Sequence, residues 1–344
     1  MNLLENSWDS KFSQKLYFKY GIIILLIINI KLQIKIIQVN RILQKKNKKH
    51  KLKDNNNFYK EMLKLYIEDR EKFYLKGRQY IMQKDGKKYD ESKIETIQDK
   101  LNYLLIHESP ENKTDLVDKI LVKNYSKKIL NKDISVPTLK IYNKASEINL
   151  EELPDKFILK CNHGSGMNIV CSDKKKFNLR KATEKLNKWM NVNYGLKGFE
   201  YQYMNVKKKI FAEKYLDDNI IDYKFNCFNG EPKFIRTKYH INGKNLNNHY
   251  SLNWTLTNIE FNWLNYIRDP SIKIAKPKNL DKMIYYARKL SSPFCFCRVD
   301  FYEVDNKVYL GELTFAPANI LMNYNDDKMR KYLGNLLDIT KIKN

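Results

Sequence analysis

Hydrophobic and polar residues alternate almost one by one from Phe294 to Phe315, the pattern of a half-buried β-strand. Asp305 and Asn306 interrupt the alternation as turn residues, so this stretch predicts a β-hairpin. Shorter runs of similar character predict further strands. These are 137–142, 154–160, 169–171, 209–215, 223–228 and 232–237, the last two joined by an Asn-Gly turn.

Apolar residues at three- and four-residue intervals predict amphipathic helices in other parts of the chain. The expected helices are 58–82, 94–107, 113–130, 178–190 and 280–290. In the third of these, the residues at core spacing are Leu116, Ile120, Leu121 and Tyr125. We expect three parts along the chain: an apolar and basic N-terminal segment (1–57), a helical region (58–150) and a strand-rich region (151–338).

The register of the hairpin decides whether Asp300 and Glu312 share a face. A two-residue loop would separate them, because side chains along a strand alternate with a period of two. We expect a three-residue loop, 305–307, which sets Asp300 directly across from Glu312 and Arg298 across from Thr314. Carboxylates opposed in this way repel each other, and Mg²⁺ is a cation that prefers such oxygen ligands. The alternative is a solvated edge hairpin whose acids point at water.

The composition is that of a folded protein of 344 residues, since 43% are hydrophobic and 13% aromatic. A formal net charge of +25 would ordinarily suggest nucleic acid or an anionic membrane as a partner. However, Lys, Asn and Ile are all abundant, which is typical of an AT-rich genome, and basic residues are spread along the chain. We therefore expect no nucleic-acid partner.

The cysteines indicate a reducing, cytoplasmic setting. The chain has 5 of them, an odd number, and none forms a C-x-x-C pair. The sequence therefore predicts neither a disulfide framework nor a zinc site. Several occupy apolar strand positions, as small buried hydrophobic residues do.

An apolar stretch, Tyr20 to Ile30 with a less apolar continuation to Val39, precedes a basic segment, 41–53, without acidic residues. Its apolar core is shorter than the roughly 20 residues that span a bilayer, and its flanks do not match a signal peptide. Two interpretations remain open. The stretch anchors the protein peripherally to an anionic cytoplasmic leaflet, or it packs on the protein itself ahead of a solvated linker.

A glycine-containing loop follows the predicted strand that ends at Lys160 and precedes the next strand. The loop reads Cys-Asn-His-Gly-Ser-Gly over 161–166. Glycines let backbone N–H groups approach phosphate oxygens closely, and Lys160 would add positive charge. The loop lacks the spacing of a Walker A motif, and an ordinary hairpin turn is the alternative. His163 reads as a loop histidine without a catalytic role.

Taken together, these motifs resemble the ATP-grasp superfamily, and more closely its TupA-like branch, found in bacterial cell-surface polysaccharide biosynthesis. The resemblance covers about residues 99–337. In chain order, it rests on Lys160 with HGSG, AEKYLDD, DYKFNCFNG, RVDFYEV and GELTFAP. It implies an α+β ATP-grasp fold, in which two α+β subdomains clasp ATP, with the ATP-binding and catalytic region at 151–338. It also implies ATP and Mg²⁺ as cofactors.

The resemblance also assigns nucleotide-binding roles to residues of several motifs. They are Lys119, Lys123, Lys160, His163, Gly164, Ser165, Gly166, Glu213, Tyr215, Leu216 and Asp218. The lysines would bind phosphates, and the HGSG loop would close over them. Glu213 would contact the adenine edge beside the backbone near Tyr215 and Leu216. Asp217 or Asp218 would contact the ribose.

The magnesium ligands of the family match Asp300 and Glu312, the pair that the hairpin register also suggests. Arg298, with Lys160, would be catalytic by stabilising charge on the transferring phosphoryl group and on the tetrahedral intermediate. Many family members carry Asn two residues after the metal-binding Glu, whereas this chain has Thr314. The Thr314 hydroxyl would ligate magnesium or a bound water, and this departure puts a second metal in doubt.

The leading hypothesis is a Mg²⁺-dependent ligase that forms an acyl phosphate and joins an amino acid or peptide unit to a sugar acid. A substrate loop is expected within 236–263. The polar and aromatic residues there include Lys238, Tyr239, His240, His249 and Tyr250. One alternative is an ATP-grasp kinase or transferase acting on a glycan precursor. Another is a non-catalytic basic protein that binds a membrane surface or nucleic acid.

Overall fold

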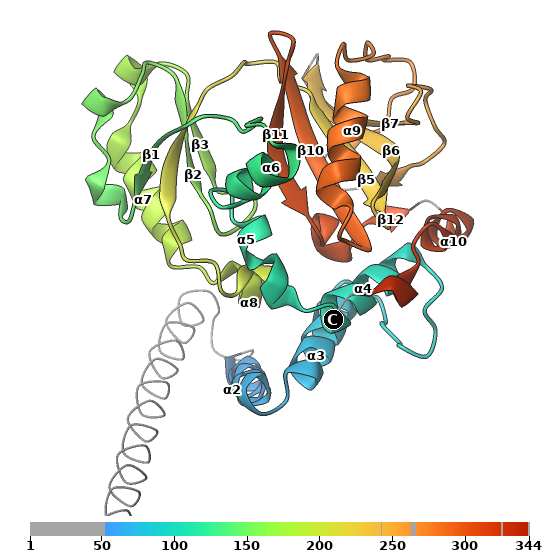
Figure 1. Ribbon diagram of the computed structural model, residues 1–344. Helices are drawn as coiled ribbons and strands as arrows, with labels where there is room; N and C mark the ends of the chain where they lie inside the picture. Colours follow the sequence, from blue (N-terminus) through green and yellow to red (C-terminus); the bar gives the residue numbers. More distant parts are fainter. Residues whose placement is uncertain (1–51, 242, 263–265, 325, 343–344) are drawn as a thin grey trace, which may run out of the picture. The chain divides into compact units, whose positions relative to one another are not determined.

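The computed structural model describes residues 52–241, 243–262, 266–324 and 326–342 (Figure 1). The chain divides into two compact units, Met1–Ile67 and Glu68–Asn344. The predicted apolar stretch and nearly all of the basic segment behind it lie outside the described residues. Within the described part of the chain, no helix combines the length and the apolar character needed to cross a membrane.

The predicted helix 58–82 is wrong in one respect, because the chain forms two helices there, α2 (Leu52–Glu68) and α3 (Arg70–Lys84). Asp69 separates them. Its backbone is extended, with φ −155°, and its carboxylate accepts the backbone N–H of Lys72 at 3.0 Å. Aspartate is a favoured N-cap because its side chain satisfies a free N–H group of the first turn. Local capping therefore interrupts a continuous apolar periodicity.

A four-stranded antiparallel sheet has the order β1-β4-β2-β3. Its strands are β1 (Thr138–Tyr142), β2 (Phe157–Cys161), β3 (Asn168–Cys171) and β4 (Ile210–Lys214). All four were predicted within a few residues. One face packs against α7 (Leu179–Met190), with Leu159, Leu186 and Ala212 in the shared core. The alternation of the strands leaves Lys160 and Glu213 on the other face.

The second sheet has six strands in the order β11-β10-β5-β6-β7-β9. They are β5 (Asp222–Phe228), β6 (Glu231–Ile241), β7 (Lys244–Tyr250), β9 (Tyr266–Ile267), β10 (Phe296–Val304) and β11 (Lys307–Thr314). Helix α9 (Leu280–Ser291) lies across one face, where Met283 and Leu290 pack with Val299 in the core (Figure 1). The opposite face carries the polar residues of the candidate site.

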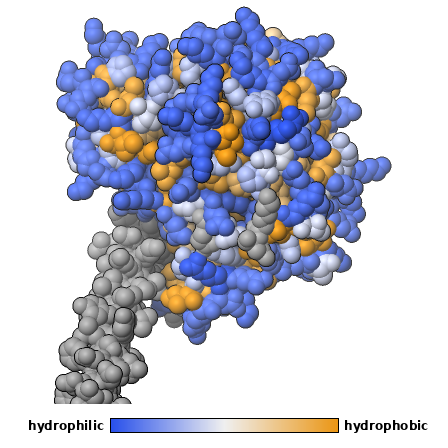
Figure 2. Space-filling view, in the orientation of Figure 1, coloured by the Kyte–Doolittle hydropathy of each residue, from blue (hydrophilic) through white to orange (hydrophobic). Residues whose placement is uncertain are grey.

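Shorter elements connect and flank these sheets. They are α4 (Ile97–His107), α5 (Thr114–Val117), α6 (Val122–Leu130), α8 (Tyr194–Gly198), α10 (Asp327–Asn335), β8 (Phe261–Asn262), β12 (Asn323–Tyr324), η1 (Pro110–Lys113), η2 (Ala145–Glu147), η3 (Leu150–Glu152), η4 (Lys174–Lys176), η5 (Tyr201–Tyr203), η6 (Pro317–Ile320) and η7 (Ile339–Lys341). Strand β8 pairs with β12, and α4 packs against α3 and α10. The face drawn in Figure 2 is mostly hydrophilic, with hydrophobic residues in small separate patches.

The predicted helix 113–130 is interrupted between α5 and α6. The Asp118 carboxylate accepts the backbone N–H groups of Ile120 and Leu121 at 2.8 and 3.3 Å. Such a local bond offers the backbone an alternative to the helix. Leu121, expected in the core, is consequently 39% exposed. The interruption also releases Lys119 from the helix, toward the six-stranded sheet.

The β10–β11 hairpin has the expected register, but its loop is shorter than predicted. Its loop has two residues, Asp305 and Asn306, and Val304 pairs with Lys307, so the predicted three-residue loop is wrong. Both loop residues have positive φ, 51° and 59°, as tight hairpin turns require. A bulge at Gly311 then shifts the pairing by one residue. The predicted opposition of Asp300 and Glu312 is confirmed because the bulge compensates for the shorter loop.

The substrate loop expected within 236–263 is largely a second hairpin, formed by β6 and β7. Lys238, Tyr239 and His240 lie on β6, while His249 and Tyr250 end β7 and are buried. The expected loop is wrong for 236–250, because β7 is rich in Asn and lacks the usual apolar alternation. Its neighbours in the sheet, rather than its own pattern, make it a strand. A substrate role of this segment stays a prediction.

Candidate active site

A row of charged side chains crosses the polar face of the six-stranded sheet. The cross-strand partners are Glu312 and Asp300, Asp300 and Lys224, Lys224 and Arg236, and Arg236 and His249. All of them except Glu312 are buried. Side chains opposed in this way interact directly. The strand order therefore brings two acids, two cations and a histidine from five strands into one continuous line.

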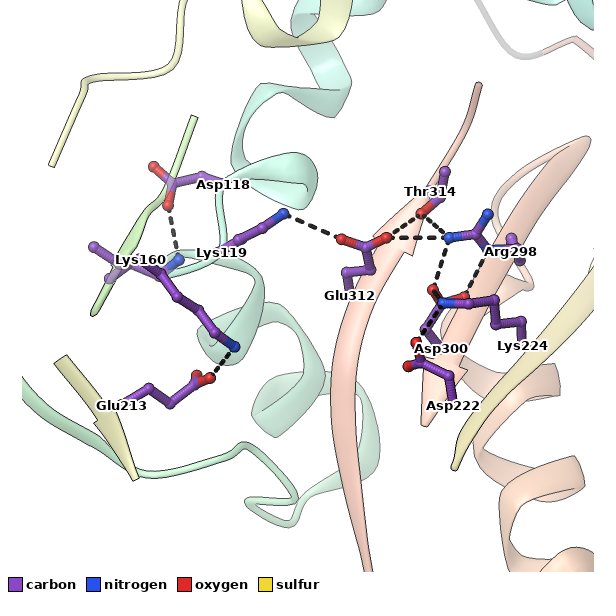
Figure 3. A network of polar contacts seen from close by, with 11 residues as sticks. Asp118, Lys119, Lys160, Glu213, Asp222, Lys224, Arg298, Asp300, Glu312 and Thr314 are labelled. Carbon is purple, nitrogen blue, oxygen red and sulfur yellow. Dashed lines mark hydrogen bonds and ion pairs between the residues drawn. The ribbon is translucent and has the colours of Figure 1, made fainter. Parts of the chain in front are cut away.

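Asp300 is the more deeply buried of the two acids in this row, with 1% of its surface exposed. It accepts hydrogen bonds from Arg298 Nε and Nη2, both at 2.7 Å, and from Lys224 Nζ at 2.5 Å (Figure 3). Lys224 also pairs with Asp222 at 3.2 Å, and Asp222 Oδ1 is buried with no hydrogen-bond partner among the described residues. A buried carboxylate persists in charged form only with partners of this kind.

Glu312 accepts hydrogen bonds from Lys119 Nζ and Arg298 Nη2, each at 3.1 Å. The Thr314 hydroxyl lies 3.1 Å from both Glu312 Oε1 and Arg298 Nη2. Burial alone would raise the pKa of Glu312, but the neighbouring cations, Lys119 first, hold it well below its usual range. Glu312 is therefore ionised at neutral pH, next to an ionised Arg298.

A second charged group faces this row from the four-stranded sheet (Figure 3). Glu213 pairs with Lys160 and, at 2.7 Å, with Lys123. Burial opposes ionisation of Glu213, yet the two lysines keep its pKa below the ordinary value. Lys119 lies between the two groups (Figure 3). The structure therefore brings the three predicted phosphate-binding lysines together with Glu213, the predicted adenine contact, and with the two predicted acidic metal ligands.

The HGSG loop is held beside Lys119 by buried polar contacts. Asn162 Nδ2 donates to Asp118 at 2.7 Å, and Lys119 N donates to Asn162 O at 3.3 Å. His163 is also buried, which lowers its pKa to about 4, and its Nε2 lies 3.2 Å from Trp189 O. At neutral pH His163 is therefore uncharged, and its side chain supports the loop.

The sequence of this chain matches a known protein family. Residues 99–338 match the family described as TupA-like ATP-grasp. The chain belongs to this family. The predicted family and the ATP-grasp fold, with its helices, mixed sheets and helical N-terminal region, are thereby confirmed.

The solved structures that resemble this TupA-like protein are distant in sequence. N5-carboxyaminoimidazole synthetase from Staphylococcus aureus in complex with ADP is 14% identical, with 60% of this chain and 46% of that chain covered and a TM-score of 0.37. D-alanine–D-alanine ligase from Bacillus anthracis in complex with ATP is 17% identical, with 64% and 62% covered and a TM-score of 0.33. The chain spans about half of the synthetase's length. No curated protein matches the sequence.

The fit of magnesium to this candidate site follows from its oxygen donors. Asp300, Glu312 and Thr314 present two carboxylates and a hydroxyl on neighbouring strands. Among the described residues, no cluster of three His, Cys, Asp or Glu side chains forms a complete metal cage. Magnesium is usually held by one or two carboxylates and completes its shell with water and phosphate oxygens. The donor set therefore fits Mg²⁺ bound together with a nucleotide.

The residues that support the assigned ones were not predicted from the sequence. They are Asp118, Asn162, Asp222, Lys224 and Arg236. Lys224 and Asp222 lie within the DYKFNCFNG motif, and their position two residues apart on one strand puts them on one face. That face could be predicted from the sequence, but its partner strand could not.

The other predicted adenine and ribose residues follow β4, the strand that carries Glu213. Tyr215 and Leu216 are partly buried, whereas the Asp218 side chain is 66% exposed. Asp218 pairs with the Tyr215 hydroxyl and, at 3.9 Å, with Lys156. The structure therefore leaves Asp218 outside the charged groups around Lys119, and its ribose contact stays a prediction.

Gly164 allows the HGSG loop to pack closely on Tyr194. A Cβ atom at Gly164 would lie 2.6 Å from the Tyr194 ring. Relieving such a clash costs about 1–3 kcal/mol, and a displaced loop no longer presents its N–H groups. We expect Gly164→Ala to weaken the binding of a Mg²⁺–ATP analogue roughly tenfold, measured by calorimetry.

The control for this prediction is Ser172→Ala, which lies just after β3 and outside the HGSG loop. Ser172 is exposed, so its replacement should leave the affinity within about twofold. Equal affinities of Gly164→Ala and the wild type would show that the loop does not position the nucleotide.

Glu200 is a buried carboxyl group, 8% exposed, that is outside the predicted site. Burial raises its pKa from 4.5 to about 7, although Arg78 and Tyr194 oppose the shift. The folded state thus favours the neutral carboxyl. The stability that Glu200 contributes is fully present below about pH 4.5 and is lost as the pH rises through about 7.

We expect Glu200→Gln to remove this pH dependence. The difference in free energy of unfolding, variant minus wild type, should increase by about 3 kcal/mol as the pH rises from 4.5 to 8. Urea unfolding across this pH range measures the difference. The exposed control Glu184→Gln should give a curve parallel to that of the wild type, and a parallel curve for Glu200→Gln would contradict the assignment.

Proposed function

We propose that this protein is a Mg²⁺-dependent ATP-grasp ligase that activates a carboxylate as an acyl phosphate and joins it to an amine. The observation that carries the proposal is the opposition of Asp300 and Glu312 on β10 and β11, with Arg298 bonded to both. Phosphoryl transfer requires mainly positioning and charge neutralisation. The charged residues on the polar face of the six-stranded sheet can supply both positioning and charge neutralisation.

In this proposal, each charged residue has a defined role in phosphoryl transfer. ATP with Mg²⁺ supplies the phosphoryl group and an electrophilic centre when bound. Asp300 and Glu312 hold the metal, with Thr314 as a further oxygen donor. Lys119, Lys123 and Lys160 bind phosphate oxygens, and the HGSG loop covers them. Arg298 stabilises the negative charge that develops on the transferring group.

The lysines are held in place by carboxylates before the nucleotide binds. Lys119 pairs with Glu312, and Lys160 pairs with Glu213. Phosphate oxygens would compete for the same ammonium groups, while the released Glu312 carboxylate would turn to the metal. This exchange of partners keeps charge balanced throughout binding, which limits the penalty of burying charged groups.

The proposed substrates are inferred from the family resemblance, because the residues of the site do not identify them. The TupA-like resemblance favours joining an amino acid or peptide unit to a sugar acid during cell-surface polysaccharide biosynthesis, in the cytoplasm. Peripheral contact of the segment 20–53 with the cytoplasmic membrane surface is part of the same hypothesis, and that segment lies almost entirely outside the described residues.

Hydroxylamine trapping tests this function without knowledge of the amine. The full chain is incubated with Mg²⁺, ATP, hydroxylamine and a panel of uronic acids, and hydroxamate and ADP are measured. Equal amounts of hydroxamate and ADP for one acid would support a ligase. ADP with a stable phosphorylated sugar and no hydroxamate would instead indicate a kinase.

A further inference from the structure

A pocket of about 360 Å³ lies within the unit Glu68–Asn344. It is lined by three segments: the end of α3 with Asp85, α8 with the residues that follow it, and η6 with Leu321. The polar and charged lining residues are Lys84, Asp85, Tyr194, Lys197, Glu200 and Asn319. Its volume lies in the range of small-molecule sites in proteins.

The pocket lining combines a buried carboxyl group with two exposed lysines. Glu200 is 8% exposed, whereas Lys84 and Lys197 are exposed. Neither lysine has a carboxylate partner among the described residues, and Lys84 Nζ lies 4.3 Å from the centroid of the Tyr80 ring. The exposed acid of the lining, Asp85, is paired with Lys87 at 2.6 Å, so the buried acid and the two lysines can complement a ligand that has an ammonium group and a carboxylate.

Tyr194 connects this pocket to the HGSG loop. It lines the pocket, and its ring packs against Gly164 of that loop. The charge of Glu312 also raises the pKa of both Tyr194 and Glu200. The pocket therefore borders the loop that would cover the phosphates.

Another part of the lining is a strained turn that follows the metal ligands along the chain, and its Asn319 Nδ2 donates to Gly198 O at 3.0 Å. Ala318, Asn319 and Ile320 have φ of 51°, 52° and 63°, the left-handed region that non-glycine residues rarely adopt. Arg78 fixes this turn by donating to Asn319 Oδ1 at 2.5 Å and to Asn319 O at 2.9 Å. Strain of this kind persists only where surrounding contacts enforce it, and it is frequent at functional sites.

We propose that this pocket binds the nucleophile of the reaction, an amine that also carries a carboxylate, and that Glu200 is its proton acceptor. The inference rests on the proposed ligase function. Glu200 would contact the ammonium group, and Lys84 and Lys197 would contact the carboxylate. The amine would then be held between Glu200 and the activated carbonyl carbon.

The proton and bond changes balance without a further reactant. The Glu200 carboxylate takes one proton from the ammonium group, which leaves a neutral amine. The amine nitrogen attacks the acyl phosphate carbon, the C–N bond forms, and the C–O bond to the phosphate breaks with its electron pair on oxygen. The second nitrogen proton leaves with the phosphate, and an amide remains. A group that titrates near pH 7 suits such a transfer at neutral pH.

A binding screen tests the pocket directly. The full chain is loaded with Mg²⁺ and β,γ-methylene-ATP and titrated calorimetrically with the proteinogenic amino acids and with their N-acetyl derivatives. We expect at least one free amino acid to bind, and its N-acetyl derivative to bind at least roughly tenfold more weakly. Glu200→Gln and Lys197→Ala should each weaken amino-acid binding to a similar extent, without changing the affinity for the nucleotide.

The control for Lys197→Ala is Lys188→Ala, which removes a lysine from α7, outside the pocket. Failure of every free amino acid to bind the nucleotide-loaded protein would overturn the inference, as would equal binding by wild type and Glu200→Gln. In both cases the proposed ligase function would stand. Failure of the nucleotide itself to bind would contradict that function instead.

A kinetic comparison separates proton transfer from binding alone. Hydroxylamine is neutral at pH 7 and needs no base, unlike an ammonium acceptor. With a uronic acid that gives hydroxamate, Glu200→Gln should retain hydroxamate formation but lose amide formation by roughly 100-fold or more. Equal losses with both nucleophiles would contradict the role of Glu200 as proton acceptor.

Discussion

Asp300→Asn is expected to lower Mg²⁺-dependent ATP turnover by roughly 10²–10³-fold or more. The substitution removes the charge that binds Arg298 and Lys224 and that would, with Glu312, hold the metal. Two buried cations would lose their shared partner, so the free energy of unfolding should also fall by about 3 kcal/mol. Coupled detection of ADP measures turnover, and urea unfolding measures stability.

Glu303→Gln is the matched control for this substitution, because Glu303 lies on the same strand outside the charged row. It accepts the backbone N–H of Asn279 at 2.8 Å and supports the start of α9. The control should lose some stability and keep its turnover. Undiminished turnover by Asp300→Asn would show that the paired-carboxylate site is wrong.

Arg78→Met is expected to produce the largest loss of stability, about 3–5 kcal/mol. Arg78 is fully buried, and its guanidinium group donates to Asn102, Gly198 and Asn319. These acceptors come from α4, α8 and η6, so a single side chain ties three segments to α3. Methionine fills a similar volume but donates no hydrogen bond, and the buried acceptors would stay unsatisfied.

Thermal unfolding checks this expectation, and a fall in Tm of roughly 10 °C corresponds to it for a unit of this size. The control is Arg180→Met on α7, where the arginine side chain is 86% exposed. Its stability should stay within about 0.5 kcal/mol of the wild type. A similarly small change in Arg78→Met would contradict the role of Arg78 in fixing the turn at Asn319.

The β10–β11 hairpin shows what the alternation of hydrophobic and polar residues can predict and what it cannot. The alternation predicted that Asp300 pairs with Glu312, but the three-residue loop assumed for this pairing was wrong. The signals of the true geometry were present: Asp305 and Asn306 tolerate positive φ, and Gly311 is a residue frequent at bulges. A bulge is nevertheless stabilised by contacts across strands, which a single-sequence pattern does not contain.

Other residues were missed because their partners are distant in the chain. Lys224 contacts Asp300 across 76 positions, since β5 lies beside β10 in the sheet. Strand order of this kind does not follow from periodicity. Lys119 was assigned from the family resemblance, but the turn that releases it from a helix depends on Asp118, whose capping competes with an uninterrupted apolar pattern.

The nucleotide-binding and catalytic roles of the individual residues stay predictions, as does membrane association of the segment 20–53. What the structure adds is their arrangement: acids and cations from both sheets gathered around Lys119 (Figure 3). That arrangement gives each assigned role a specific partner, and hence a specific variant that tests it.

The measurement that tests the central claim most directly is calorimetry of ATP binding, with and without Mg²⁺, by the wild type and Glu312→Gln. The account predicts tight binding by the wild type only when Mg²⁺ is present, and binding weakened at least roughly tenfold in Glu312→Gln. Binding of equal strength in both proteins, or no dependence on Mg²⁺, would contradict a metal–nucleotide site at Asp300 and Glu312.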